Sequence, residues 1–125
     1  MRIYLAGPMM SIPQFNFPAF HAAAAKLRAE GHEVFNPAER DIKAHGDAFA
    51  ENNLTGDNAQ AERDHGFNLR EALADDMAWI CRHAEAVALL PGWQASAGAN
   101  AELATALALG LKVIELEIKT GEAAP

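Results

Sequence analysis

Short apolar runs alternate along the chain with longer segments in which apolar residues recur every three to four positions. The short runs predict buried strands and the longer segments predict amphipathic helices. Glycine and proline mark several boundaries, and we expect Asn16 to cap the first helix. The expected strands are Arg2–Ala6, His32–Phe35, Glu85–Leu90 and Lys112–Leu116, and the expected helices are residues 16–30, 68–83 and 98–109.

The alternation of strand and helix predicts the α/β class, with a parallel sheet of four or five strands between two helical layers in a single domain. Residues 41–66 fit this pattern least, because they are polar and rich in glycine and asparagine. Short helical turns are expected at 38–44 and 60–64, and the whole segment is a candidate lid or insertion. The tail at 120–125 is expected to be loose.

Composition narrows the function classes. The 125 residues carry 10 Lys and Arg against 17 Asp and Glu, a net charge of -7. Nucleic-acid polymers require clustered basic residues, so this charge argues against such a partner but not against a small nucleotide. No apolar run could span a bilayer and no signal peptide is visible, so we expect a cytoplasmic protein. The single cysteine, Cys81, fits a reducing compartment and is expected to be buried.

The stretch from Ala86 to Glu102 combines a strand, a Pro-Gly break and the start of an alanine-rich helix. Ligands of α/β sheets bind where strand ends meet helix starts, so Glu102 is a candidate nucleophile kept ionised by the helix dipole. The alternative is an ordinary acid in the first turns of a helix, and spacing alone favours it slightly. Ser96 and Gly98 are either a helix cap or an anion site.

Asp76 flanks the apolar stripe of its helix and could face the strand ends, although an ordinary exposed acid is favoured on spacing alone. Tyr4, the single tyrosine, is either a packing residue or a site residue, and Trp93 is open to the same two interpretations. The five histidines lack metal-ligand spacing. We therefore expect no metal and no organic cofactor.

Taken together, the motifs resemble the nucleoside 2-deoxyribosyltransferase-like superfamily, with a small phage and bacterial branch as the most similar group. The resemblance covers nearly the whole chain except residues 41–66 and the tail. It is carried by IYLAGPM near the start, FNPAE after the second strand, DMAWI, and LLPGW-x-x-S-x-G-A-x-x-E followed by A-x-x-L-G. The resemblance implies a flavodoxin-like fold that cleaves the N-glycosidic bond of (deoxy)nucleosides or their 5′-monophosphates.

By this resemblance Glu102 would be the nucleophile, Asp76 the acid that assists the departing base, and Tyr4 the residue that orients Glu102. Ser96 replaces an aspartate of the nucleoside transferases and matches a serine of the related 5′-monophosphate N-hydrolases, which favours a nucleotide substrate. Asp76 would be protonated when the bond breaks. Further expected substrate-binding residues are Gly7, Pro8, Met9, Phe15, Asn16, Trp93, Gly98 and Ala99.

The leading hypothesis is thus a nucleotide N-glycosidase with a glycosyl-enzyme intermediate, which releases free base or exchanges it for another. The alternatives are a non-catalytic nucleotide-binding or sensing module and a phage accessory protein with an interaction role. A homodimer or higher homo-oligomer is expected. Phe49, Leu54 and Ile118 are candidates for apolar contacts between copies or for a lid, unless they pack locally.

Overall fold

Four parallel strands form the centre of the molecule, in the order β2-β1-β3-β4. They are β1 (Arg2–Ala6), β2 (Glu33–Phe35), β3 (Ala86–Leu89) and β4 (Lys112–Glu115). This computed structural model describes residues 1–117, so the expected loose tail at 120–125 and Ile118 lie outside the described residues. In the register of the sheet, Tyr4 lies opposite Phe35 on one side and Val87 on the other.

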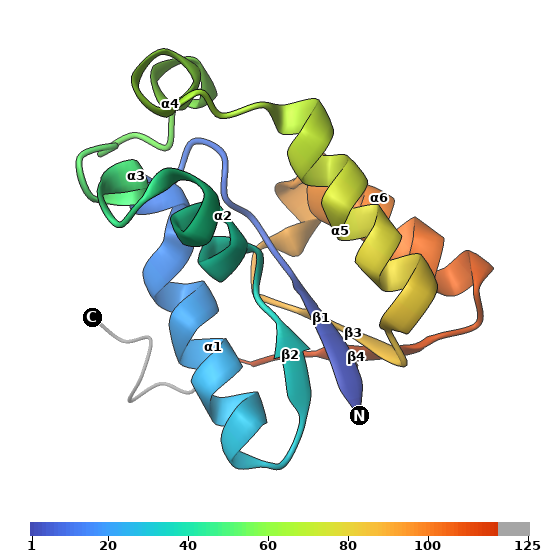
Figure 1. The fold of residues 1–125 in the computed structure, drawn as a ribbon. Helices are drawn as coiled ribbons and strands as arrows, with labels where there is room; N and C mark the ends of the chain where they lie inside the picture. Colours follow the sequence, from blue (N-terminus) through green and yellow to red (C-terminus); the bar gives the residue numbers. More distant parts are fainter. Residues whose placement is uncertain (118–125) are drawn as a thin grey trace.

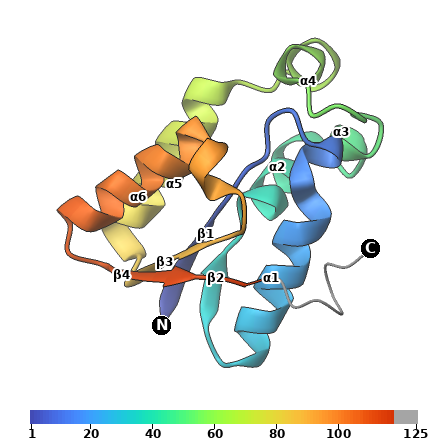
Figure 2. The same cartoon turned by 180° about the vertical axis from the view of Figure 1, so that it is seen from behind.

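Helices cover both faces of the sheet. Figures 1 and 2 show α1 and α2 on one side of it and α5 and α6 on the other, with α3 and α4 at one end. Two 3-10 turns, η1 and η2, precede α1 and α6. The bounds are η1 Pro13–Asn16, α1 Phe17–Ala29, α2 Pro37–His45, α3 Ala48–Glu51, α4 Asn58–His65, α5 Leu69–His83, η2 Trp93–Ala95 and α6 Ala97–Ala108.

Alternate residues of the central strands point to opposite faces, as strand geometry requires. Ile3 and Leu5 of β1 belong to the larger apolar core, which is shared with α1. Tyr4 and Ala6 belong to the smaller core, which includes Ile80 of α5. The expected α/β class with a parallel sheet in three layers within one domain is confirmed.

Residues 41–66 are more ordered than their polar composition indicated. Most of the segment is helical, with α2 continuing to His45 and α3 and α4 following. Phe49 has 2% of its surface exposed and stacks on Phe15 and Phe17. Phe49 therefore packs locally and is not available for contacts between copies, whereas Leu54 is 69% exposed. A lid function for this segment stays a prediction.

Two local expectations are wrong. Asn16 occupies the position before α1, but it is in the left-handed conformation and its side chain makes no capping bond. Its amide donates instead to the Pro8 carbonyl at 3.0 Å. Cys81 is exposed, because it follows the buried Ile80 and is turned away from the sheet by one helical step.

The connectivity places a crevice at the carboxyl ends of β1 and β3. The chain leaves β1 toward β2 on one side, and returns past β1 to β3 on the other. Such a switch point is where ligands bind in open α/β sheets. Across residues 1–117, no helix combines the length and apolar character needed to cross a membrane.

Candidate functional site

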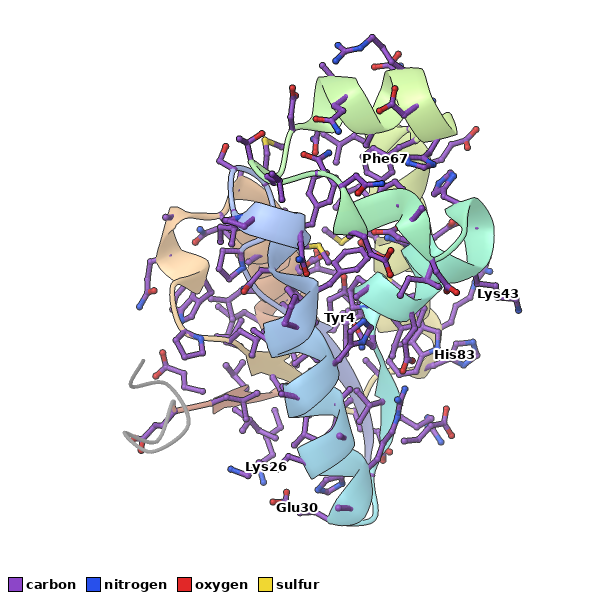
Figure 3. All side chains as sticks on the ribbon, turned by 90° about the vertical axis from the view of Figure 1, so that its left-hand side faces the viewer. Tyr4, Lys26, Glu30, Lys43, Phe67 and His83 are labelled. Carbon is purple, nitrogen blue, oxygen red and sulfur yellow. The ribbon has the colours of Figure 1, made fainter. Side chains whose placement is uncertain are left out.

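A tyrosine and a glutamate from distant parts of the chain meet above the sheet. The Tyr4 hydroxyl donates to Oε2 of Glu102 at 2.6 Å, and both side chains are buried. Tyr4 points this way because even-numbered residues of β1 face α5 and α6. Glu102 lies in the second turn of α6, which starts after the β3 strand end. Figure 3 shows Tyr4 in the packed interior, with Phe67 nearer to α4 and Lys26, Glu30 and Lys43 at the periphery.

Asp76 of α5 lies beside this pair and is 7% exposed. Its Oδ1 atom accepts a hydrogen bond of 2.5 Å from Nη1 of Arg40 on α2. The same guanidinium donates through Nε to Asp41 at 2.9 Å and through Nη1 to the Ala72 carbonyl at 3.1 Å. Arg40 therefore ties α2 to α5 directly beside the Tyr4–Glu102 pair.

Glu102 is a buried carboxyl group that is harder to ionise than an ordinary glutamate. Burial, followed by the neighbouring Asp76 carboxyl, raises the pKa of Glu102 to about 8, although the Tyr4 hydrogen bond opposes the rise. Burial therefore opposes the ionised state that the helix start is expected to favour. The effect of a helix dipole fades within the first turn, and Glu102 lies beyond it.

Asp76 is the more ionisable of the two carboxyl groups. Burial raises its pKa as well, but the charge and hydrogen bond of Arg40 oppose that rise. Burial and the charge of Glu102 raise the pKa of Tyr4 well above its ordinary value, so Tyr4 stays a hydroxyl donor. The cluster thus holds two neighbouring buried carboxyl groups with raised pKa values, a pair that can share one proton.

A cavity of about 270 Å³ opens onto these groups. Six of the expected substrate-binding residues line it together with the expected catalytic residues. Aromatic side chains from η1, from α3 and from the loop before α5 form its apolar wall. The expected residues that line it are Tyr4, Asp76 and Glu102 with Gly7, Met9, Phe15, Ser96, Gly98 and Ala99.

The start of α6 presents polar backbone groups to this cavity. Ser96 is the cap of α6, and its Oγ atom accepts a hydrogen bond from the Ala99 amide at 3.1 Å. The amides of Ala97 and Gly98 have no hydrogen-bond partner within residues 1–117. Since the Ser96 hydroxyl can still donate, three donors remain at the helix start for an anionic group.

Comparison with protein families identifies one match. The sequence model of a family described as "Domain of unknown function (DUF4406)" matches residues 1–115. The chain belongs to this family. No curated protein and no solved structure matches the chain.

Three expected substrate-binding residues of this DUF4406 domain lie outside the cavity. Pro8 and Asn16 line a larger groove of about 1140 Å³, which borders the cavity at Ser96 and Gly98. Trp93 lines neither space, and its indole Nε1 donates to Glu115 at 3.2 Å. Proximity in sequence to the α6 start misplaced Trp93, because η2 turns its side chain toward β4.

Several residues of the DUF4406 site were not expected from the sequence. Arg40 is the most important, and its signal was present: it lies one turn into the helix that Asn36 and Pro37 start after β2. That is the same kind of position that singled out Glu102 after β3. The other unexpected lining residues with polar or aromatic side chains are Phe20, Asp41, Phe49, Asn58 and Phe67.

Backbone strain accompanies the cavity wall at Phe15. Gln14, Phe15 and Asn16 all have positive φ angles between 51° and 61°, a conformation that costs energy for residues other than glycine. The Gln14 amide is held by the Asn53 carbonyl at 2.9 Å. Gly56 packs so closely that a Cβ atom there would lie 2.3 Å from the Ile12 carbonyl oxygen. The 53–56 turn therefore braces this loop.

Within residues 1–117, no group of three or more His, Cys, Asp or Glu side chains is arranged to hold a metal ion. The chemistry available to this DUF4406 site is that of two buried carboxyl groups, a tyrosine hydroxyl and a guanidinium. These groups can attack, donate or accept a proton at a substrate in the cavity.

Proposed function

We propose that the protein cleaves the N-glycosidic bond of a (deoxy)nucleoside 5′-monophosphate through a glycosyl-enzyme intermediate. The observation that carries the proposal is the buried cluster in which Tyr4 holds Glu102 and Asp76 lies beside it. The motif resemblance to the nucleoside 2-deoxyribosyltransferase-like superfamily supports the same activity. A nucleophilic carboxylate assisted by a second carboxyl group is the arrangement of a retaining displacement.

In the first step Glu102 attacks the anomeric carbon and the bond from that carbon to the base nitrogen breaks. A single proton is relayed in this step. Asp76 takes it from Glu102 and passes it on to the departing base. Glu102 thereby becomes a nucleophilic carboxylate as the leaving group is protonated. Tyr4 occupies Oε2 of Glu102, which leaves Oε1 for the attack. The products are a glycosyl ester on Glu102, an Asp76 carboxylate and the neutral base.

In the second step water attacks the anomeric carbon, and Asp76 accepts the proton that the water loses. The ester bond breaks, Glu102 leaves as a carboxylate, and it recovers the proton from Asp76. The cluster then returns to its starting state with one proton. A second base in place of water would give base exchange.

The cavity suits such a substrate in two further ways. Ser96 and the amides of Ala97 and Gly98 offer donors for a 5′-phosphate at the α6 start. Phe15 and Phe67 contribute flat apolar surface on which a base can stack. The volume of about 270 Å³ is close to the lower limit of known ligand pockets, near 300 Å³, so a small substrate fits best.

A panel of ribo- and deoxyribonucleosides and their 5′-monophosphates tests the proposal, with release of free base followed by chromatography. We expect monophosphates to react faster than nucleosides. Glu102→Gln and Asp76→Asn should each lower kcat by at least about 10³-fold, since both act in the bond-breaking step. Asp75→Asn is the matched control, because Asp75 is the exposed neighbour of Asp76 on the same helix.

A folded wild-type protein that releases no base from any member of the panel would contradict the proposal. Activity that survives in Glu102→Gln would remove Glu102 as the nucleophile.

One observation favours a second candidate, a nucleotide-binding or sensing module. Burial raises the pKa of Glu102 to about 8, and this opposes the ionised form that a nucleophile needs. Nucleotide binding by calorimetry without turnover would favour that candidate.

We also propose that the protein acts as a homodimer or higher homo-oligomer. Large apolar side chains on α5 and α6 support this, since Leu69 is 51% and Leu107 is 62% exposed. Light scattering at micromolar concentration tests it. A monomeric mass would contradict it.

A further inference from the structure

Arg40 makes three hydrogen bonds that fix its guanidinium in one orientation. Nε binds Asp41 Oδ1, while Nη1 binds both Asp76 Oδ1 and the Ala72 carbonyl. Ala72 and Asp76 are four residues apart on α5, so Arg40 holds the backbone and the side chain of α5 at the same turn. The guanidinium borders the cavity with 19% of its side chain exposed.

We propose that Arg40 is a positioning residue that fixes Asp76 through its Oδ1 atom and reserves Oδ2 for proton exchange with Glu102 and the leaving base. The inference rests on the proposed function for its role in catalysis. It goes beyond that function because it assigns Arg40, a residue outside the expected catalytic set, to the control of where the proton resides.

Geometry explains why a rigid fork is needed at this place. Asp76 must face two partners in turn, Glu102 before bond cleavage and the base during it. A freely rotating carboxylate would present either oxygen, whereas a guanidinium held at three points restricts Asp76 to one orientation. Asp41, which is 5% exposed, supplies the opposite anchor and keeps Arg40 from turning toward the substrate.

Several charged groups face Asp76 from the surrounding elements. Tyr4 and Glu102 approach it from β1 and α6, and Arg40 and Asp41 approach it from α2, where His45 acts on Asp41. Arg40 is the cation that bonds directly to Asp76. Removing its charge should therefore raise the pKa of Asp76 by about one to three units, the usual effect of an arginine beside a carboxyl group.

The test compares Arg40→Gln, Arg40→Lys and the wild-type protein. Carboxyl carbons of Asp and Glu are titrated by NMR, and kcat and KM are measured against pH. In Arg40→Gln both limbs of the pH profile should move to higher pH, with the acidic limb shifted by about one unit or more. Arg40→Lys keeps the charge without the fork, so the limbs should stay in place while kcat falls by about 10-fold or more at similar KM.

Arg28→Gln is the matched control, because Arg28 forms an exposed pair with Glu39 outside the cavity. It should shift neither the titration of Asp76 and Glu102 nor the pH profile, although the titration of Glu39 should change. An Arg40→Gln protein that titrates like the wild type overturns the inference, as does an equal shift in Arg28→Gln. The NMR titration tests the influence of Arg40 on Asp76 even when the wild type releases no base. Failure of this inference and failure of the proposed function can therefore be distinguished. If Arg40→Gln fails to fold, an Arg40→Lys protein with unchanged kcat overturns the inference.

Discussion

Two arginine–carboxylate pairs start from neighbouring residues of α2 and lead to opposite environments. Glu39 points outward and accepts two hydrogen bonds of 2.6 Å from Arg28 of α1. Arg40 points inward and bonds to Asp41 and Asp76 beside the cavity. The side chains of the outer pair are 41% and 45% exposed, whereas those of Arg40 and Asp76 are 19% and 10% exposed.

The comparison shows that the environment of an ion pair, more than its hydrogen-bond geometry, decides its consequences. The outer pair has the better fork geometry, yet water screens it, and such pairs contribute about 0–1 kcal/mol. The inner pair is desolvated, and replacing such pairs by apolar residues is often neutral for stability. Its retention in a cavity with Glu102 and Tyr4 fits a role in proton placement better than a role in stability.

The largest expected effect comes from breaking the inner pair on one side. Arg40→Met leaves Asp41 and Asp76 buried without their cation, and this should lower the free energy of unfolding by about 3–5 kcal/mol near neutral pH. The loss should shrink in acid, because both carboxyl groups, whose pKa values burial already raises, can then protonate. Urea unfolding at several pH values measures it. A loss independent of pH would show that packing of the arginine stem, and not its charge, is responsible.

The second-largest effect is a gain in stability, and it is expected when Glu102 is replaced by glutamine. The pKa of Glu102 is about 8 in the folded protein against 4.5 ordinarily, so the folded state binds this proton more tightly than the unfolded chain. Stability therefore falls as the pH rises from 4.5 toward about 8, and Glu102→Gln removes that fall. We expect Glu102→Gln to be more stable than the wild type by about 2–4 kcal/mol above pH 8.

Thermal unfolding across this pH range measures the effect of Glu102→Gln. The matched control is Glu115→Gln, which replaces an exposed glutamate and keeps Glu102, so its stability should fall with rising pH as that of the wild type does. Equal stability of Glu102→Gln and the wild type at every pH would mean that Glu102 carries no excess proton. We expect Glu102→Gln to gain stability and to lose the proposed glycosidase activity together. A buried carboxyl group that has to ionise for catalysis lowers the stability of the folded protein.

The fold could be predicted from sequence because its signals are local and redundant. Val87 and its apolar neighbours can only be a buried strand, and Gly7-Pro8 can only end one. The alternation of strands and helices then leaves few topologies. Residues 41–66 were harder to predict, because their helices are short and polar outside and depend on a few buried contacts such as Phe49 and Asn53.

The site was predictable only in part, for physical reasons. Tyr4, Asp76 and Glu102 were found through the motifs, and the parallel sheet explains how they meet. Arg40 was not predicted as a site residue, because Asp76 lies on another helix, 36 residues further along the chain. The spacing of apolar residues within one helix gives no information about such contacts between helices. The raised pKa of Glu102 was also not predicted, because a pKa depends on burial and neighbours that only coordinates supply.

A smaller loss of stability is expected when Tyr4, which lies beside the inner pair, is replaced. Tyr4→Phe removes the hydroxyl that donates to Glu102 while keeping the ring in the core. We expect a loss of about 1–3 kcal/mol, the usual result when a buried polar group loses its partner. Because the Tyr4 hydrogen bond lowers the pKa of Glu102, that pKa should rise in Tyr4→Phe, which NMR titration detects. An unchanged Glu102 titration would argue against Tyr4 as the group that orients the nucleophile.

The smallest effect is expected at the outer pair, and it completes the comparison. Arg28→Met removes a bidentate ion pair whose geometry is better than that of the inner one, yet stability should change by no more than about 1 kcal/mol. Any loss should shrink further in high salt, since exposed charges are screened. Urea unfolding in low and high salt measures both. A loss as large as that of Arg40→Met would mean that the Arg28 contact with the Val34 carbonyl braces α1 against β2, and that burial alone does not separate the two pairs.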